Sequence, residues 1–185
     1  MVIHGFQKLT LLDYPGKVAC TLFSGGCNFR CPFCQNGNLV QHPEWEPVIP
    51  EEEIFAVLEK RRGVLDGVCV TGGEPTLDPD LERFVTKIKE LGYLVKLDTN
   101  GYRPEILKKL VEEKKIDYVA MDIKNAPSRY GETAGVKKID VMRINESVEF
   151  LKSGVVDYEF RTTLCQELHL SLIHISEPTR LDVIS

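Results

Sequence analysis

A loop with three closely spaced cysteines constrains this chain more than any other feature. Three residues separate Cys27 from Cys31 and two separate Cys31 from Cys34, so one short loop can direct all three thiols towards a common centre. Thiolates bind soft metals, chiefly zinc, copper(I) and the irons of iron–sulfur clusters. A [4Fe-4S] cluster normally has four thiolate ligands, so a cluster with only these three would have one iron open to a substrate.

Two simpler explanations of the cysteine loop remain open. Structural zinc usually has four protein ligands in paired spacings, so a loop with three thiols would be half of a zinc site completed by another chain. The spacing can also arise by chance. The flanking segments Gly25-Gly26 and Asn36-Gly37-Asn38 favour a tightly wrapped backbone.

Length and composition are typical of one globular domain. The 185 residues suffice for a sizeable core, and a net charge of −5 without a basic tract gives no indication of nucleic-acid binding. The N-terminus lacks the build of a signal peptide, and no apolar run approaches a membrane span. We therefore expect a cytoplasmic protein, in which the six cysteines are thiols or metal ligands rather than disulfides.

Short β-rich segments alternate with amphipathic segments along the chain. After a lead-in segment that ends at Tyr14-Pro15-Gly16, the sequence predicts strands at residues 17–23, 67–71, 93–97, 117–121 and 157–162. It predicts a helix that begins near residue 51, and further helices at 79–91, 104–114 and 141–151. This alternation predicts an α/β fold with a parallel sheet and right-handed crossovers.

Polar motifs directly follow the expected strands. Gly72-Gly73-Glu74 follows the second strand, Asp98-Thr99-Asn100 the third and Asp122-Ile123-Lys124 the fourth, while Arg161 lies near the end of the fifth. In a β/α barrel these positions converge on the rim where active sites are built. Their convergence with the cysteine loop predicts an enzyme.

The cysteine loop and Gly72-Gly73-Glu74 together resemble the radical S-adenosylmethionine (SAM) enzymes, and the resemblance covers roughly residues 6–169. More closely, three segments are similar to the glycyl-radical activating enzymes, and best to the anaerobic ribonucleoside-triphosphate reductase activating proteins. They are Gly5-Phe6-Gln7-Lys8, Leu12-Asp13-Tyr14-Pro15-Gly16 and Gly25-Gly26-Cys27-Asn28-Phe29-Arg30-Cys31-Pro32. The resemblance implies a partial parallel β/α barrel of the radical SAM type over residues 1–169, truncated after about the fifth strand.

The resemblance also implies a cofactor site with two occupants. Cys27, Cys31 and Cys34 would bind a [4Fe-4S] cluster. The residues implied to bind SAM are Phe33 near the adenine, Gly72, Gly73 and Glu74 at the amino group, and Asp98, Thr99, Asn100, Asp122, Lys124 and Arg161 around the methionine carboxylate. Two like-charged aspartates beside a carboxylate would repel it, so a monovalent cation between Asp98 and Asp122 is a further expectation.

The implied activity is the reductive cleavage of SAM to a 5′-deoxyadenosyl radical, which generates a glycyl radical on a partner reductase. The expected partners are anaerobic ribonucleoside-triphosphate reductase and a flavodoxin- or ferredoxin-like electron donor, with no nucleic acid and no membrane. Alternatives are a pyruvate formate-lyase-type activase or another radical SAM enzyme that modifies a small molecule or peptide. An alternative of another class is a non-catalytic zinc or electron-transfer module.

Each motif also has a purely structural explanation. Gly72-Gly73 can form a strand-to-helix turn, the two aspartates can cap helices or lie in solvent, and Phe33 can pack within its own loop. Lys124 can be a surface lysine and Arg161 part of a structural ion pair. The remaining cysteines lie on or near expected strands, where small buried thiols are common; they are Cys20, Cys69 and Cys165.

The C-terminal segment differs from the rest of the chain. Residues 170–185 show neither a helical stripe nor the surrounding composition, and 170–180 resemble the in-frame translation of a transposon-type sequencing-library adapter. We therefore expect a non-native tail at 170–185 and a domain that is incomplete at its C-terminus. His174 is excluded as a ligand on that ground.

Overall fold

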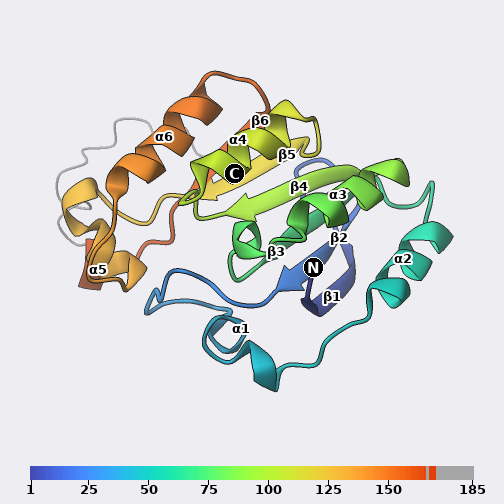
Figure 1. Cartoon of the computed structure of the whole chain (residues 1–185), viewed down its shortest axis with the longest axis horizontal. Coiled ribbons are helices and arrows are strands. Elements are labelled where there is room, and N and C mark those ends of the chain that lie inside the picture. The colour runs from blue at the N-terminus through green and yellow to red at the C-terminus, as the bar shows by residue number, and fades with distance from the viewer. Residues whose placement is uncertain (166, 170–185) are drawn as a thin grey trace.

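The computed structural model describes residues 1–165 and 167–169, which form a curved six-stranded sheet with helices on one face (Figure 1). The residues predicted to be a non-native tail, 170–185, lie outside the described part. The strands pair in chain order and are β1 Ile3–Thr10, β2 Ala19–Ser24, β3 Gly67–Gly72, β4 Leu94–Thr99, β5 Tyr118–Asp122 and β6 Asp157–Arg161.

Strands β2 to β6 are all parallel, which confirms the five strands and the partial β/α barrel predicted from the sequence. Strand β1 was not predicted: the segment before Tyr14 pairs antiparallel with β2 and does not merely lead into it. Its sequence mixes apolar, glycine and charged residues without alternation, so only the pairing with β2 identifies it as a strand.

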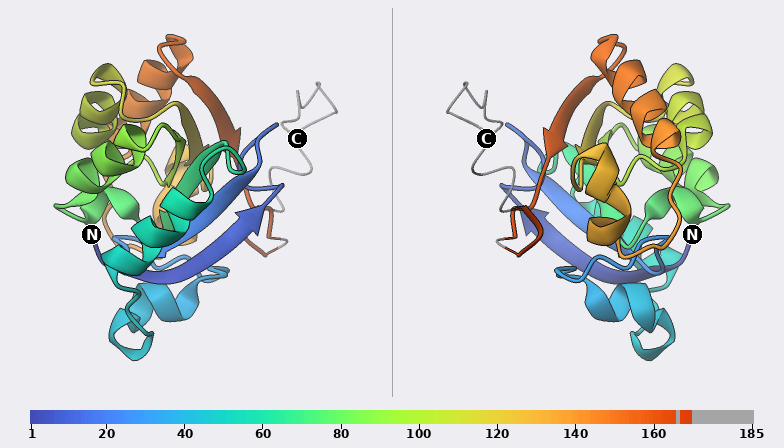
Figure 2. Two further views of the ribbon diagram at one scale, coloured as in Figure 1. Left: turned by 90° about the vertical axis from the view of Figure 1, so that its right-hand side faces the viewer. Right: turned by 90° about the vertical axis from the view of Figure 1, so that its left-hand side faces the viewer.

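Helices cover the outer face of the sheet, while its inner face curves around the barrel interior (Figure 2). Core residues such as Leu22, Val68 and Val95 point towards these helices. The helices are α1 Gly37–Gln41, α2 Glu51–Lys60, α3 Leu81–Glu90, α4 Pro104–Glu112, α5 Tyr130–Ala134 and α6 Val141–Lys152, with short 3₁₀ helices η1 Pro43–Trp45, η2 Pro75–Leu77 and η3 Pro127–Arg129. Among the described residues no helix combines the length and hydropathy required to cross a membrane.

Tyr14 closes the amino end of the barrel interior. Its side chain is buried against Ala19 and Cys69, and its ring lies 5.8 Å from that of Tyr118. Cys20 and Cys69 are fully buried, as predicted for core thiols, whereas Cys165 is partly exposed. The interior is therefore closed at the amino end, and the polar strand-end residues lie at the opposite, carboxyl end.

Candidate functional site

The cysteine loop is held in place by its backbone and by one buried ring. The Arg30 amide donates to the Ala134 carbonyl of α5 at 2.8 Å. Phe29 is buried, with its ring centroid 5.6 Å from that of Tyr102 and 6.5 Å from that of Tyr130. Because these anchors do not involve the thiols, the sulfur atoms remain available to line the space next to the loop.

The glycine pair at the end of β3 permits close contact with the start of the cysteine loop. The Gly73 amide donates to the Ser24 carbonyl at 2.9 Å, and the Glu74 amide donates to the Gly26 carbonyl at 2.8 Å. A Cβ at position 73 would lie 1.8 Å from the Gly26 oxygen, and position 72 has a φ of +114°. Glycine is therefore required by backbone packing at both positions, whatever else the pair does.

One cavity of about 330 Å³ lies between the cysteine loop and the carboxyl ends of β3 to β6. Every site residue predicted from the sequence lines it: Cys27, Cys31, Phe33, Cys34, Gly72, Gly73, Glu74, Asp98, Thr99, Asn100, Asp122, Lys124 and Arg161. The remaining lining residues are Phe29, Gln35, Asn36, Val40, Thr71, Thr162 and Thr163. The residues predicted from the sequence therefore surround one cavity, and their contacts divide it into two different sides.

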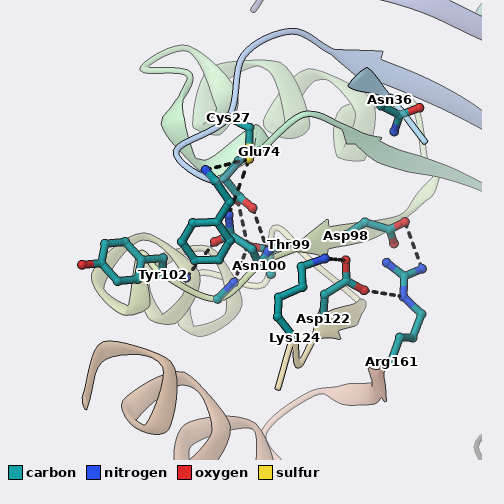
Figure 3. Close-up of polar contacts among 12 residues, drawn as sticks. Cys27, Asn36, Glu74, Asp98, Thr99, Asn100, Tyr102, Asp122, Lys124 and Arg161 are labelled. Atoms are coloured by element: carbon teal, nitrogen blue, oxygen red, sulfur yellow. Dashed lines mark hydrogen bonds and ion pairs between the residues drawn. The ribbon is translucent and has the colours of Figure 1, made fainter. Parts of the chain in front are cut away.

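The first side of the cavity, which we call the cysteine-loop side, consists of Cys27, Glu74, Thr99 and Asn100 (Figure 3), with Asn28 bonded to Asn100. The Asn100 amide nitrogen donates to Asn28 Oδ1 at 2.8 Å and approaches Cys27 Sγ at 3.8 Å. The Asn100 backbone amide donates to Glu74 Oε2 at 2.7 Å. Asn100 therefore connects the cysteine loop to Glu74 and is directed away from the predicted carboxylate site.

Glu74 is the centre of this side. It is 2% exposed, and its Oε1 accepts hydrogen bonds from the Thr76 amide at 3.1 Å, the Thr76 hydroxyl at 2.5 Å and the Thr99 hydroxyl at 2.8 Å. Burial raises the pKa of Glu74, while these donors and the Asn100 amide favour the ionised form. The Thr99 hydroxyl donates its proton to Glu74, so in this arrangement that proton is not available to a carboxylate in the cavity.

The second side, which we call the ion-pair side, consists of Asp98, Asp122, Lys124 and Arg161 (Figure 3). Arg161 Nε lies 3.1 Å from Asp122 Oδ1, and its Nη1 lies 3.2 Å from Asp98 Oδ2. Lys124 Nζ lies 2.9 Å from Asp122 Oδ2. The register that places Arg161 beside Asp122 on neighbouring strands produces this arrangement.

Arg161 places a positive charge between the two aspartates, where a monovalent cation was expected. Arg161 bridges Asp98 and Asp122, so the two aspartates do not face each other unscreened. Burial lowers the pKa of Arg161, but Asp98 and Asp122 raise it, and the net change is upward. Burial likewise lowers the pKa of Lys124, while Asp122, Cys31 and Cys27 together raise it, and the net change is upward. The Lys124 ammonium lies 6.0 Å from the Phe33 ring centroid.

The three thiols fit a cluster better than a single ion. Among the described residues, no group of three or more Cys, His, Asp or Glu side chains is placed to hold one metal ion, whereas the thiolates of a cubane each bind a different iron. Burial raises the pKa of Cys27 to about 11 and also raises that of Cys31, which Lys124 partly offsets. Their thiolates therefore need a bound positive charge, which an iron–sulfur cluster supplies.

Sequence reasoning missed three polar contributors to the site. Asn28 accepts from Asn100, and Asn36 donates to the Gly72 carbonyl at 2.9 Å. Lys96, which is 1% exposed, lies 2.6 Å from Asp98 Oδ1. The sequence feature that could have identified Lys96 is its position two residues before Asp98 in an apolar strand. Residues two apart in a strand point to the same face of the sheet.

Comparisons with known proteins show the family to which the chain belongs. The family described as the Radical SAM superfamily matches residues 21–163. A Methanocaldococcus jannaschii protein, whose name assigns it to the glycyl-radical enzyme activating enzymes, is 34% identical over 88% of this chain and 68% of its own length. The pyruvate formate-lyase-activating enzyme of Staphylococcus aureus (strain USA300) is 34% identical over 54% of this chain and 41% of its own length.

Solved structures show the same fold at low sequence identity. The protein anSMEcpe with bound AdoMet matches with a TM-score of 0.59 at 19% identity, over 82% of this chain and 43% of that one. TYW1 with a lysine-pyruvate adduct matches with a TM-score of 0.55 at 22% identity, over 82% of this chain and 56% of that one. The chain therefore spans about half the length of these structural relatives.

Proposed function

The chain belongs to the radical SAM superfamily of enzymes, and on that premise we propose that it is an activase that generates a glycyl radical on anaerobic ribonucleoside-triphosphate reductase. The observation that carries this proposal is the single cavity that combines three thiols with the ion-pair side. The names of its relatives in Methanocaldococcus jannaschii and Staphylococcus aureus support an activase. We further propose a cytoplasmic enzyme that takes its electron from a flavodoxin- or ferredoxin-like donor.

In this proposal Cys27, Cys31 and Cys34, which line the cavity, would hold a [4Fe-4S] cluster and leave one iron without a protein ligand. When bound and reduced, the cluster supplies the electron that cleaves the sulfonium of SAM. The loop anchors at Phe29 and Arg30 fix the backbone on which the cysteines lie. The protein thus contributes the position of the thiols, while the cofactors supply the chemistry.

The ion-pair side is suited to the methionine part of SAM. That part carries a carboxylate and an ammonium, and the cavity offers the cations Lys124 and Arg161 beside the anions Asp98 and Asp122. Glu74 Oε2 accepts one hydrogen bond among the described residues, so it has capacity for the substrate ammonium. A monovalent cation between Asp98 and Asp122 stays part of the proposal, and it would share these carboxylates with Arg161, which pairs with both.

The target is tested by adding purified reductases to the anaerobic, reconstituted protein with SAM and a chemical reductant. A glycyl-radical signal on anaerobic ribonucleoside-triphosphate reductase, absent with a Cys31→Ala variant, is the expected electron paramagnetic resonance result. A glycyl-radical signal only on pyruvate formate-lyase would show that this enzyme, the alternative target, is the one activated. SAM cleavage with no signal on either reductase would contradict an activase and favour modification of a smaller molecule.

A further inference from the structure

Lys96 is a buried cation beneath the cavity that does not line it. It lies on β4 two residues before Asp98, with 1% of its surface exposed. Its ammonium is 2.6 Å from Asp98 Oδ1, 3.7 Å from Glu159 Oε1 and 5.9 Å from the Tyr118 ring centroid. Asp98 is therefore its closest charged partner.

Stability alone does not explain a lysine in this position. Removing an ammonium from water costs several kcal/mol, and a buried ion pair recovers this only with excellent geometry. An apolar residue of similar volume would satisfy the packing at least as well. The contacts of Lys96 indicate instead an effect on the groups that line the cavity.

Asp98 connects Lys96 to the cavity because its two oxygens have different partners. Oδ1 pairs with Lys96 from the barrel interior, and Oδ2 pairs with Arg161 from the cavity side. Without Lys96, Arg161 would be the only cation on Asp98, and the guanidinium would be drawn fully into that pair. With Lys96 present, its ammonium offsets most of the negative charge of Asp98 from the side of the barrel interior.

We propose that Lys96 is a positioning residue that neutralises Asp98 so that the charge of Arg161 is available to an anionic group in the cavity. This inference rests on the proposed function, in which that group is the methionine carboxylate of SAM. Arg161 is suited to the task, because 37% of its side chain is exposed, in contrast to Asp98 at 14%. Lys96 itself touches neither the cavity nor its ligand.

The test compares the binding of SAM with that of decarboxylated SAM, which lacks the carboxylate. Dissociation constants are measured for anaerobically reconstituted wild type, Lys96→Met and Lys96→Arg, with iron content determined for each. We expect Lys96→Met to weaken SAM binding about tenfold, and binding of the decarboxylated analogue by less than about threefold. Lys96→Arg, which retains the charge, should restore most of the preference for SAM.

The control is Lys89→Met, which removes a lysine from another partly buried pair. Lys89 lies 2.7 Å from Asp117, at the amino end of the sheet, and neither residue lines the cavity. This variant should bind both compounds as wild type does. If the loss of one lysine charge acted only through stability, Lys89→Met and Lys96→Met would both show it. A changed preference for SAM over decarboxylated SAM should appear only in Lys96→Met.

The outcomes separate this inference from the proposed function. If wild type prefers SAM and Lys96→Met retains the same preference, Lys96 is not a positioning residue, and the proposed function stands. If Lys96→Met and a second neutral variant, Lys96→Gln, both fail to fold, Lys96 is structural and the inference is wrong. If wild-type protein with a complete cluster binds neither compound, the result contradicts the proposed function itself.

Discussion

The cysteine-loop side and the ion-pair side of the cavity use polar groups in different ways. On the cysteine-loop side, Glu74 and Asn100 bond to neighbouring residues of the chain, so their polar atoms are largely occupied. On the ion-pair side, Asp98, Asp122 and Arg161 form charged contacts of 3.1 to 3.2 Å that an incoming charged ligand can share or replace. The first side fixes the loop that carries the thiols, and the second provides the charges for a ligand.

This difference predicts that substitutions on the cysteine-loop side mainly change folding and cluster content. Substitutions on the ion-pair side should mainly change ligand affinity, because partly exposed charges contribute little to stability. The variants below test that division, starting with the largest expected effect.

Replacing any one of Cys27, Cys31 or Cys34 by serine should abolish a stable cluster. Reconstituted wild type should contain about four irons per chain, and each serine variant should lose most of this iron and its visible absorbance. The matched control is Cys69→Ala, which removes a fully buried thiol outside the cavity. Equal iron content in the serine variants and in the control would contradict the assignment of these ligands.

Gly73→Ala should lower the free energy of unfolding by about 3 kcal/mol, because the new Cβ would overlap the Gly26 carbonyl. Urea unfolding of the cluster-free protein measures this change. Gly37→Ala is the control, since a Cβ there meets no atom within 4 Å. It should change stability by less than about 0.5 kcal/mol. Wild-type stability of Gly73→Ala would show that the loop does not need this close backbone contact.

Glu74→Gln should lower the free energy of unfolding by about 2 kcal/mol, because an amide nitrogen would face hydrogen-bond donors in a buried site. The donors are the amides of Thr76 and Asn100 and the hydroxyls of Thr76 and Thr99. Urea unfolding measures the loss, with Glu59→Gln as an exposed control. A variant as stable as wild type would mean that these bonds do not hold the cysteine-loop side together.

Arg161→Met should weaken SAM binding about tenfold, or about 1.4 kcal/mol, while changing the free energy of unfolding by less than that. Binding by the reconstituted protein and urea unfolding are measured on the same preparation. Arg103→Met, which removes a surface arginine paired with Glu105 at 2.7 Å, is the control. A large loss of stability with unchanged affinity would reverse the assignment of the two sides.

The sequence predicted the parallel strands and the grouping of the polar motifs around one cavity, because both depend on local patterns. Each parallel strand is a short apolar run, and each is followed by a polar motif whose position at the carboxyl end follows from the fold. The sequence did not predict β1, whose identity as a strand depends on pairing with β2.

The contacts inside the cavity also could not be read from the sequence. The bridge from Arg161 on β6 to Asp98 on β4 crosses the intervening strand β5, and its geometry depends on register and side-chain rotamers. Lys96 looked like an ordinary strand lysine, because burial at that position is a property of the closed barrel interior. The turn at Gly72-Gly73 was predicted, but its contact with Gly26 was not.

The most direct test of this account is electron paramagnetic resonance of the anaerobically reconstituted, reduced protein with and without SAM. We predict a [4Fe-4S] signal that changes when SAM is added, because the three cysteines leave one iron accessible from the cavity. A cluster signal that is the same with and without SAM would contradict an open iron next to the ion-pair side. Folded protein that assembles no cluster would contradict the central claim that Cys27, Cys31 and Cys34 bind one.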